Sequence, residues 1–209
     1  FKREVEPNIC VLENISFSPS ELDAYKMKVG HDLFTQDLWF LLGQFEQADN
    51  FGSLIRPQVK HPEQLLERLE ELGAFDDLLL FSTNEKVKKV LRQAERLSPR
   101  YHVVVANPPY MGSKGMNSEI KDFAKQYYPD SKSDLFAMFL ERGFALTKDQ
   151  GQVGFVTPYV WMFLKTYESL RLHIVKNYTI TNLVQLEYNA FEPAVIPVCA
   201  YTMQKFYNP

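Results

Sequence analysis

The chain has 209 residues, which is long enough for one α/β domain with a sizeable core, or for such a domain and a small subdomain. Its 45% hydrophobic and 23% charged residues are typical of a soluble globular protein, and its 14% aromatic content leaves rings for a binding site besides those of the core. The net charge of −3 argues against an extended nucleic-acid-binding surface, which would be basic. If the protein acts on DNA, phosphate contacts must come from a local patch or from sequence outside this chain.

The cysteines and histidines show no metal-binding pattern, so no metal is expected. Cys10 and Cys199 lie in apolar, strand-like contexts, which favours buried thiols in a reduced, cytoplasmic compartment, and the four histidines are scattered. No apolar run approaches the length of a membrane span and no signal peptide is visible, so no membrane partner is expected. The chain begins with Phe1 rather than Met, which indicates a piece of a longer protein.

The first hundred residues predict a strand followed by helices. Asn8–Phe17 is rich in β-forming residues, and residues 1–17 are therefore assigned to a strand of the sheet. Ser18 to Glu21 match a capping box with proline at the first helical position, which predicts a helix that ends near Val29.

Apolar spacing predicts more helices before residue 99. Residues 18–98 are therefore expected to form a mainly helical insertion. Its further predicted elements are helices at Leu33–Ala48, Pro62–Leu72 and Glu85–Leu97, and a loop or short strand at Phe51–Pro57.

Strands and helices alternate over residues 99–209. Tyr101–Ala106 is a β-branched run typical of a strand buried on both faces of a parallel sheet. The order predicts an open α/β sheet, and its last two strands are too close for a crossover helix, so they should form an antiparallel hairpin. The elements predicted after the first strand are a helix at Asp134–Thr147, a strand at Gln152–Thr157, a helix at Thr166–Lys176, and strands at Ile180–Glu187 and Val198–Phe206.

The tetrapeptide Asn107-Pro108-Pro109-Tyr110 follows the strand directly, at the edge where open α/β sheets bind ligands. Asn107 and Pro108 both precede a proline and are therefore held extended. The prolines have no N–H, so the loop presents carbonyl acceptors without competing donors, while Asn107 adds an amide oxygen and Tyr110 a flat ring.

Methylation of an aromatic amine requires such an arrangement. The lone pair of the adenine amino nitrogen is conjugated with the ring and is a poor nucleophile. Asn107 Oδ1 and the Pro108 carbonyl can hold the two amino hydrogens, which frees the lone pair to attack a sulfonium methyl group, while Tyr110 stacks on the flipped base. The predicted catalytic residues are therefore Asn107, Pro108, Pro109 and Tyr110. The alternative is that Asn-Pro-Pro is only a rigid turn.

A strand followed by Asn-Pro-Pro-Tyr resembles the fourth motif of amino-group methyltransferases. The longer sequence around this motif is similar to the large adenine-specific methyltransferases of bacteriophage-exclusion (BREX) phage-defence systems. This resemblance implies a Rossmann-like class I methyltransferase sheet, of which the chain holds the C-terminal half. It also implies S-adenosylmethionine as cofactor, DNA as partner and possible contacts with other phage-defence proteins. The segments that carry the likeness are FGSLIRP (Phe51–Pro57), ANPPYMGSKGMN (Ala106–Asn117), SDLFAMFLERG (Ser133–Gly143) and GQVGFVTPYVW (Gly151–Trp161).

The resemblance implies two binding residues beyond the motif. Phe191 matches an aromatic that packs against the flipped base in related enzymes, although a core phenylalanine fits the sequence equally well. Asp134 matches a segment close to the cofactor, but a helix start made by Ser133 and Asp134 is the favoured interpretation.

Three further residues are candidates for the substrate side. Thr157 and Pro158 end the second strand at the same sheet edge as Asn107, where they either line the pocket or simply terminate the strand. Lys114 lies in a glycine-containing loop from which it could contact a phosphate, although a lone exposed lysine is usually only solvated.

The glycine-rich turn that holds S-adenosylmethionine in these enzymes is missing, because the chain has no Gly-x-Gly. In the resembled family that turn precedes the segment present here, and a target-recognition domain is expected after it. The chain alone is therefore expected to bind the cofactor weakly or not at all and to be inactive. Two other functions stay open: the same chemistry on RNA or protein glutamine, and a non-catalytic DNA-binding or assembly subunit with this fold.

Overall fold

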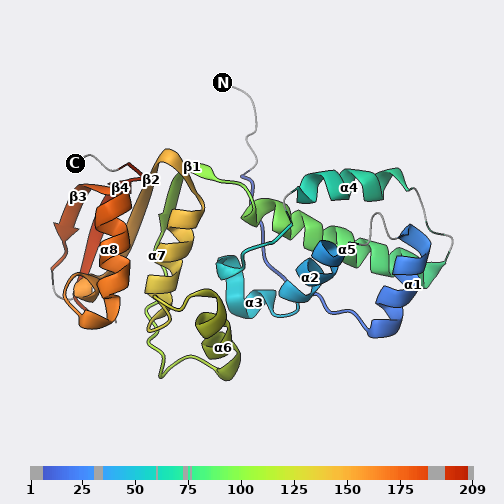
Figure 1. Cartoon of the computed structure of the whole chain (residues 1–209), viewed down its shortest axis with the longest axis horizontal. Helices are drawn as coiled ribbons and strands as arrows, with labels where there is room; N and C mark the ends of the chain where they lie inside the picture. The colour runs from blue at the N-terminus through green and yellow to red at the C-terminus, as the bar shows by residue number, and fades with distance from the viewer. Residues whose placement is uncertain are drawn as a thin grey trace. The chain divides into compact units, whose positions relative to one another are not determined.

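The computed structural model describes residues 7–30, 35–59, 61–72, 75, 77–187 and 196–206. The chain divides into two compact units, Phe1–Pro99 and Arg100–Pro209. The first consists of helices and connecting segments, and the second is a sheet with helices (Figure 1).

The first unit is built around the long helix α5 (Leu78–Leu97), which α1 (Pro19–Val29), α2 (Gln36–Gln44) and α4 (Pro62–Glu71) contact. The helix α3 (Ala48–Phe51) continues into a 3-10 turn at Gly52–Leu54. The predicted helices that start at Ser18 and Pro62 are confirmed. The most deeply buried side chains of this helical core include Tyr25, Phe45, Leu41, Leu69 and Leu91.

Two helices differ in extent from the prediction. The single helix predicted over Leu33–Ala48 is divided, because α2 ends where the Phe45 N–H donates to the Leu42 carbonyl in a tight turn. The helix predicted from Glu85 already begins at Leu78. Its cap is the Asp77 carboxylate, which accepts the N–H groups of Leu79 at 2.8 Å and Leu80 at 3.1 Å.

The predicted strand at Asn8–Phe17 is wrong: residues 7–17 contain no strand. A strand needs a neighbouring ladder, and this segment bonds to the helical unit instead. The Ile15 N–H donates to the Phe45 carbonyl at 3.0 Å, and the Glu13 N–H donates to Gln93 Oε1 at 2.9 Å. Ile15 is 6% exposed within the helical core, and Leu12 and Phe17 pack against the same core, so the second half of this segment serves helix packing.

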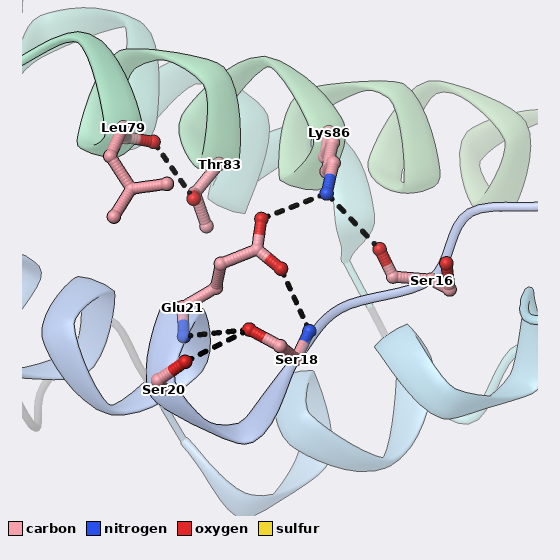
Figure 2. Close-up of polar contacts among 7 residues, drawn as sticks. All are labelled: Ser16, Ser18, Ser20, Glu21, Leu79, Thr83 and Lys86. Atoms are coloured by element: carbon pink, nitrogen blue, oxygen red, sulfur yellow. Dashed lines mark hydrogen bonds and ion pairs between the residues drawn. The ribbon is translucent and has the colours of Figure 1, made fainter.

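The capping box at Ser18 is confirmed and joins α1 to α5 (Figure 2). Ser18 Oγ accepts the Glu21 N–H at 3.2 Å, and Glu21 Oε2 accepts the Ser18 N–H at 2.8 Å. The other carboxylate oxygen of Glu21 accepts from Lys86 Nζ at 2.8 Å, and this ammonium also donates to the Ser16 carbonyl. One carboxylate therefore closes the start of α1 and ties it to α5.

The second unit is a four-stranded sheet with the order β1-β2-β4-β3. The strands β1 (Tyr101–Ala106) and β2 (Thr147–Pro158) run parallel. The strand β4 (Val198–Gln204) is antiparallel to both β2 and β3 (Thr179–Gln185). The predicted α/β sheet with a terminal antiparallel hairpin is therefore confirmed.

The helices α7 (Leu135–Ala145) and α8 (Glu168–Asn177) cover one face of this sheet (Figure 1). Their buried side chains form one cluster with Phe155 of β2 and Tyr201 of β4. The helix α6 (Ser118–Tyr127), in the connection between β1 and α7, was not predicted, although Asn117 caps it by accepting the Ile120 N–H at 2.8 Å.

The opposite face of the sheet is open, which corrects the expectation that β1 is buried on both faces. Val103 is 60% exposed and Val105 is 76% exposed, because no described helix of this unit packs over them. Their neighbours Gly154, Val156 and Ala200 line a shallow depression of about 280 Å³ that reaches Asn107. β1 therefore has one covered face, one open face and one unpaired edge.

Among the described residues, no helix is both long and apolar enough to span a bilayer.

Candidate active site

The Asn107–Tyr110 loop leaves the carboxyl end of β1, beside the end of the parallel strand β2. Asn107 and Pro109 are exposed, Pro108 is buried and Tyr110 is half-buried. The register pairs Ala106 with Phe155, so the loop starts level with the last residues of β2. The structure therefore places the four predicted catalytic residues at one sheet edge, with Asn107 at its open side.

The Tyr110 hydroxyl lies between two acceptors. It is 3.1 Å from Asn107 Oδ1 and 3.1 Å from the Val156 carbonyl oxygen. Burial, followed by the nearby Cys199 thiol, raises the pKa of Tyr110, so the phenol remains neutral and has one proton to donate. Asn107 and Val156 therefore compete for that proton, and the amide oxygen of Asn107 is free when Val156 receives it.

Thr157 is buried near the end of β2, against side chains of β4. Its side chain is fully buried, and its Oγ1 is 3.1 Å from the Tyr201 hydroxyl. The Cys199 thiol donates to the Thr157 carbonyl at 3.6 Å, and burial raises the pKa of this thiol to about 11. Pro158 is also buried at the end of β2. Thr157 and Pro158 are thus buried at the end of β2, and their predicted contact with a substrate stays a prediction.

Asp134 is the N-cap of α7, as the favoured interpretation expected. Its Oδ1 accepts the N–H groups of Phe136 and Met111, each at 3.1 Å. The Ser113 N–H donates to the Ser133 carbonyl, and a β-bridge joins Gly112 to Asp134. Burial raises the pKa of Asp134, although the backbone donors oppose this shift. The carboxylate thereby fixes the loop after Tyr110 to α7, a role that the sequence analysis missed.

The remaining predicted residues lie around this loop. Lys114 is exposed in the turn that the Gly115 N–H closes on the Gly112 carbonyl, with no ion pair to another described residue. Phe191 lies outside the described residues.

The described residues contain neither a cluster of metal-binding side chains nor a Gly-x-Gly turn. Across the described ranges, no group of three or more His, Cys, Asp or Glu side chains could hold a metal ion. None of the described strands is followed by a Gly-x-Gly turn, and the Asp134 carboxylate is engaged by backbone donors.

Comparison with known proteins identifies relatives of the chain. The family model described as Eco57I restriction-modification methylase matches residues 33–191. An adenine-specific methyltransferase, BrxX, from Escherichia coli O9:H4 (strain HS) is 40% identical over 178 residues, or 80% of this chain and 15% of that protein. An adenine-specific methyltransferase, PglX, from Lacticaseibacillus casei (strain Zhang) is 31% identical, over 98% of this chain and 18% of that protein. The chain thus spans less than a fifth of the length of these two relatives.

Solved structures resemble the chain less closely. One is a class I S-adenosylmethionine-dependent methyltransferase from Listeria monocytogenes, described as putative in its own structure report. It is 18% identical, with a TM-score of 0.43, over 88% of this chain and 66% of that chain. A likeness at this level decides nothing about the site, which is defined by the strand order and by the loop geometry.

Proposed function

Because this chain belongs to the Eco57I restriction-modification methylase family, we propose that the complete protein transfers a methyl group to the N6 amino group of adenine in DNA. The observation that carries this proposal is the pair of acceptors at the carboxyl end of β1. Asn107 is exposed, and the Pro108 carbonyl accepts no hydrogen bond from a described residue. The names of the relatives at 40% and 31% identity support adenine as the methylated base.

In the proposed reaction, a flipped adenine enters with its amino group toward Asn107. Asn107 Oδ1 accepts one amino hydrogen and the Pro108 carbonyl accepts the other, so the nitrogen lone pair is withdrawn from conjugation. S-adenosylmethionine, when bound by the complete protein, supplies the methyl group as an electrophilic sulfonium substituent. As the nitrogen forms its new bond to the methyl carbon, the carbon–sulfur bond of the donor would break with its electron pair left on sulfur. Loss of one amino proton to solvent then gives the neutral methylated base.

Tyr110 contributes its ring and its hydroxyl in different ways. The half-buried ring offers a face on which the flipped base stacks. The hydroxyl can give its proton to the Val156 carbonyl at 3.1 Å, which leaves Asn107 Oδ1 available to the amine. Pro109 holds the preceding residue extended and has no N–H that would compete for these acceptors.

Other residues are proposed to act around the two acceptors, Asn107 Oδ1 and the Pro108 carbonyl. We also propose that Lys114 contacts a phosphate next to the target base and that Phe191 packs against that base. For Asp134 we propose an indirect role near the cofactor, because its carboxylate holds the loop after Tyr110 against α7. The resemblance to phage-defence enzymes leads us to propose a role in phage defence or restriction-modification, with other defence proteins as partners.

The test is to express the complete protein, or its Asn107→Ala variant, in bacteria without other adenine methylation. Long-read sequencing of genomic DNA should detect N6-methyladenine at one sequence context with the wild type only. Mass spectrometry of RNA and of protein glutamine from the same cells distinguishes the alternative substrates. Methylated RNA or glutamine with unmethylated DNA would contradict the proposal, and so would DNA methylation that is unchanged in Asn107→Ala.

A further inference from the structure

The segment between β2 and α8 has a rigid backbone. It consists of two 3-10 turns, Tyr159–Met162 and Lys165–Tyr167. The N–H groups of Phe163 and Leu164 donate to the Val160 carbonyl in the first turn, and the Tyr167 N–H donates to the Leu164 carbonyl in the second. Arg171 donates through Nη1 to the carbonyls of Trp161 and Leu164, which fixes the residues between them. Trp161 and Tyr167 anchor the segment in the buried cluster of the sheet unit, where they are 3% and 5% exposed.

This rigid segment presents two large apolar side chains to solvent. Phe163 is 71% exposed and Leu164 is 50% exposed, while Trp161 before them and Tyr167 after them are buried. The Tyr159 ring meets the Phe163 ring edge to face, with centroids 5.8 Å apart and planes at 89°. Single exposed apolar residues are ordinary. An adjacent pair held outward on a fixed backbone is preorganised for a partner, because little conformational freedom remains to be lost on binding.

The pair lies at the same sheet edge as the proposed active site. β1 and β2 are parallel, so the Asn107 loop and the segment after Pro158 both leave their carboxyl ends, at the lower edge of the sheet unit in Figure 1. Tyr159 and Tyr110 pack against the same buried cluster.

The local charge fits an anionic partner. Within the segment itself, residues 159–167, Lys165 is the one charged side chain, in a chain of net charge −3. Lys165, next to Leu164, is exposed and makes no ion pair with any residue that the structure describes. An apolar pair followed by a free cation matches a duplex, which offers base faces beside phosphates.

We propose that Phe163 and Leu164 form a wedge that enters the DNA duplex at the target adenine. This inference rests on the proposed function. The Phe163 ring stacks against the bases that remain when the adenine leaves the helix, and Leu164 covers the vacated step, while Lys165 contacts a neighbouring phosphate. Flipping a paired base costs its stacking and pairing. The wedge offsets part of that cost by occupying the gap, so it assists extrusion and has no part in methyl transfer itself.

The experiment uses the complete protein and two duplexes that contain the sequence context found by sequencing. In one duplex the target adenine is paired, and in the other it lies opposite an abasic position, where extrusion costs least. Phe163→Ala should lower single-turnover methylation of the paired duplex about tenfold or more, and should stay within about twofold of the wild type on the abasic duplex. Phe163→Trp should retain activity on both. Leu172→Ala, an exposed leucine of α8, is the matched control.

A second measurement reports extrusion without methyl transfer. With 2-aminopurine in place of the target adenine, the wild type should raise fluorescence on binding, and Phe163→Ala should raise it much less in the paired duplex. Equal losses on both duplexes, or a lowered melting temperature, would show that Phe163 packs against another part of the protein and would overturn the wedge. Unchanged methylation of the paired duplex would overturn it too. If the wild type itself methylates no adenine in DNA, it is the proposed function that fails.

Discussion

The two units differ in what their polar groups bind. In the helical unit, charged side chains around α5 are paired within the unit: Lys86 with Glu21, Lys89 with Glu13 and Arg92 with Glu70. At the carboxyl edge of the sheet unit, the Pro108 carbonyl has no donor among the described residues, and Asn107 shares a single tyrosine proton with Val156. Groups that are satisfied internally stabilise their unit. Groups that a rigid loop leaves incompletely satisfied are the ones available to a substrate.

The largest effect on turnover should come from the sheet unit, whose acceptors are incompletely satisfied. Asn107→Ala removes one acceptor aimed at the reacting amine and leaves β1 and both prolines in place, so we expect turnover to fall about 100- to 1,000-fold, or roughly 2.7–4 kcal/mol. Methyl incorporation into DNA by the complete protein measures it, and thermal melting should be unchanged. Asn177→Ala, an exposed asparagine of α8, is the control. Full activity of a folded Asn107→Ala protein would remove the basis of the comparison.

The two faces of the sheet provide the next test. A Cβ added at Gly143 of α7 would lie 2.4 Å from Phe155 Cζ, whereas one at Gly154, on the open face, would meet its nearest atom at 3.7 Å. We expect Gly143→Ala to lower the free energy of unfolding by about 1–3 kcal/mol, because the covered side is already filled. Gly154→Ala should change it by less than about 0.5 kcal/mol. Hydrogen exchange of β2 amides in the complete protein distinguishes the two, and similar losses would mean that the second face is covered as well.

Substitutions of Tyr110 should have smaller effects, and they distinguish the role of its ring from that of its hydroxyl. Tyr110→Ala should weaken substrate binding by about 1–3 kcal/mol, because one stacking contact is lost. Tyr110→Phe keeps the ring and loses the hydrogen bonds at 3.1 Å to Asn107 and Val156. Since a neutral hydrogen bond contributes about 0.5–1.5 kcal/mol, we expect at most about a tenfold loss, in kcat rather than in KM. A Tyr110→Phe enzyme as impaired as Tyr110→Ala would show that the hydroxyl matters more than the ring.

The smallest effect belongs to the helical unit and concerns pH. The Lys86 ammonium and the Ser18 N–H lower the pKa of Glu21 from 4.5 to about 2. A carboxyl whose pKa is lowered by folding stabilises above its unfolded pKa, and this contribution is lost as the pH falls from about 4.5 to about 2. Glu21→Gln should remove about 1–2 kcal/mol at neutral pH and flatten the acid limb of a stability–pH curve. Methylation by Glu21→Gln at neutral pH should be unaffected. If turnover fell along with stability, the helical unit would also be needed for activity.

Local chemistry explains which parts of this fold could be predicted from sequence. The Ser18 box, the Asn107 loop and the terminal hairpin depend on a few adjacent residues, whose caps, prolines and spacing limit the backbone directly. The prediction of a strand at Asn8–Phe17 was wrong because β-forming side chains do not specify a partner strand. This segment donates hydrogen bonds to Phe45 and Gln93 instead.

The parts of the site that could not be predicted depend on contacts distant in sequence. Nothing near Asp134 signals that its carboxylate holds the Met111 amide as well as its own helix. The same holds for Thr157, whose burial depends on Tyr201 of another strand. Helix α6 is different, because Asn117 and the apolar spacing of Ile120, Phe123 and Ala124 were available and would have predicted it.

The edge position of β1 has a consequence for how this chain behaves in solution. On the side away from β2, the backbone N–H and C=O groups of residues 102–106 have no strand beside them in the described sheet, and Val103 and Val105 expose their side chains next to that row. A flat apolar edge of this kind is a template on which another extended segment can add. At high concentration the 209-residue chain should therefore self-associate through β1, with an increase in light scattering that Val105→Lys would suppress.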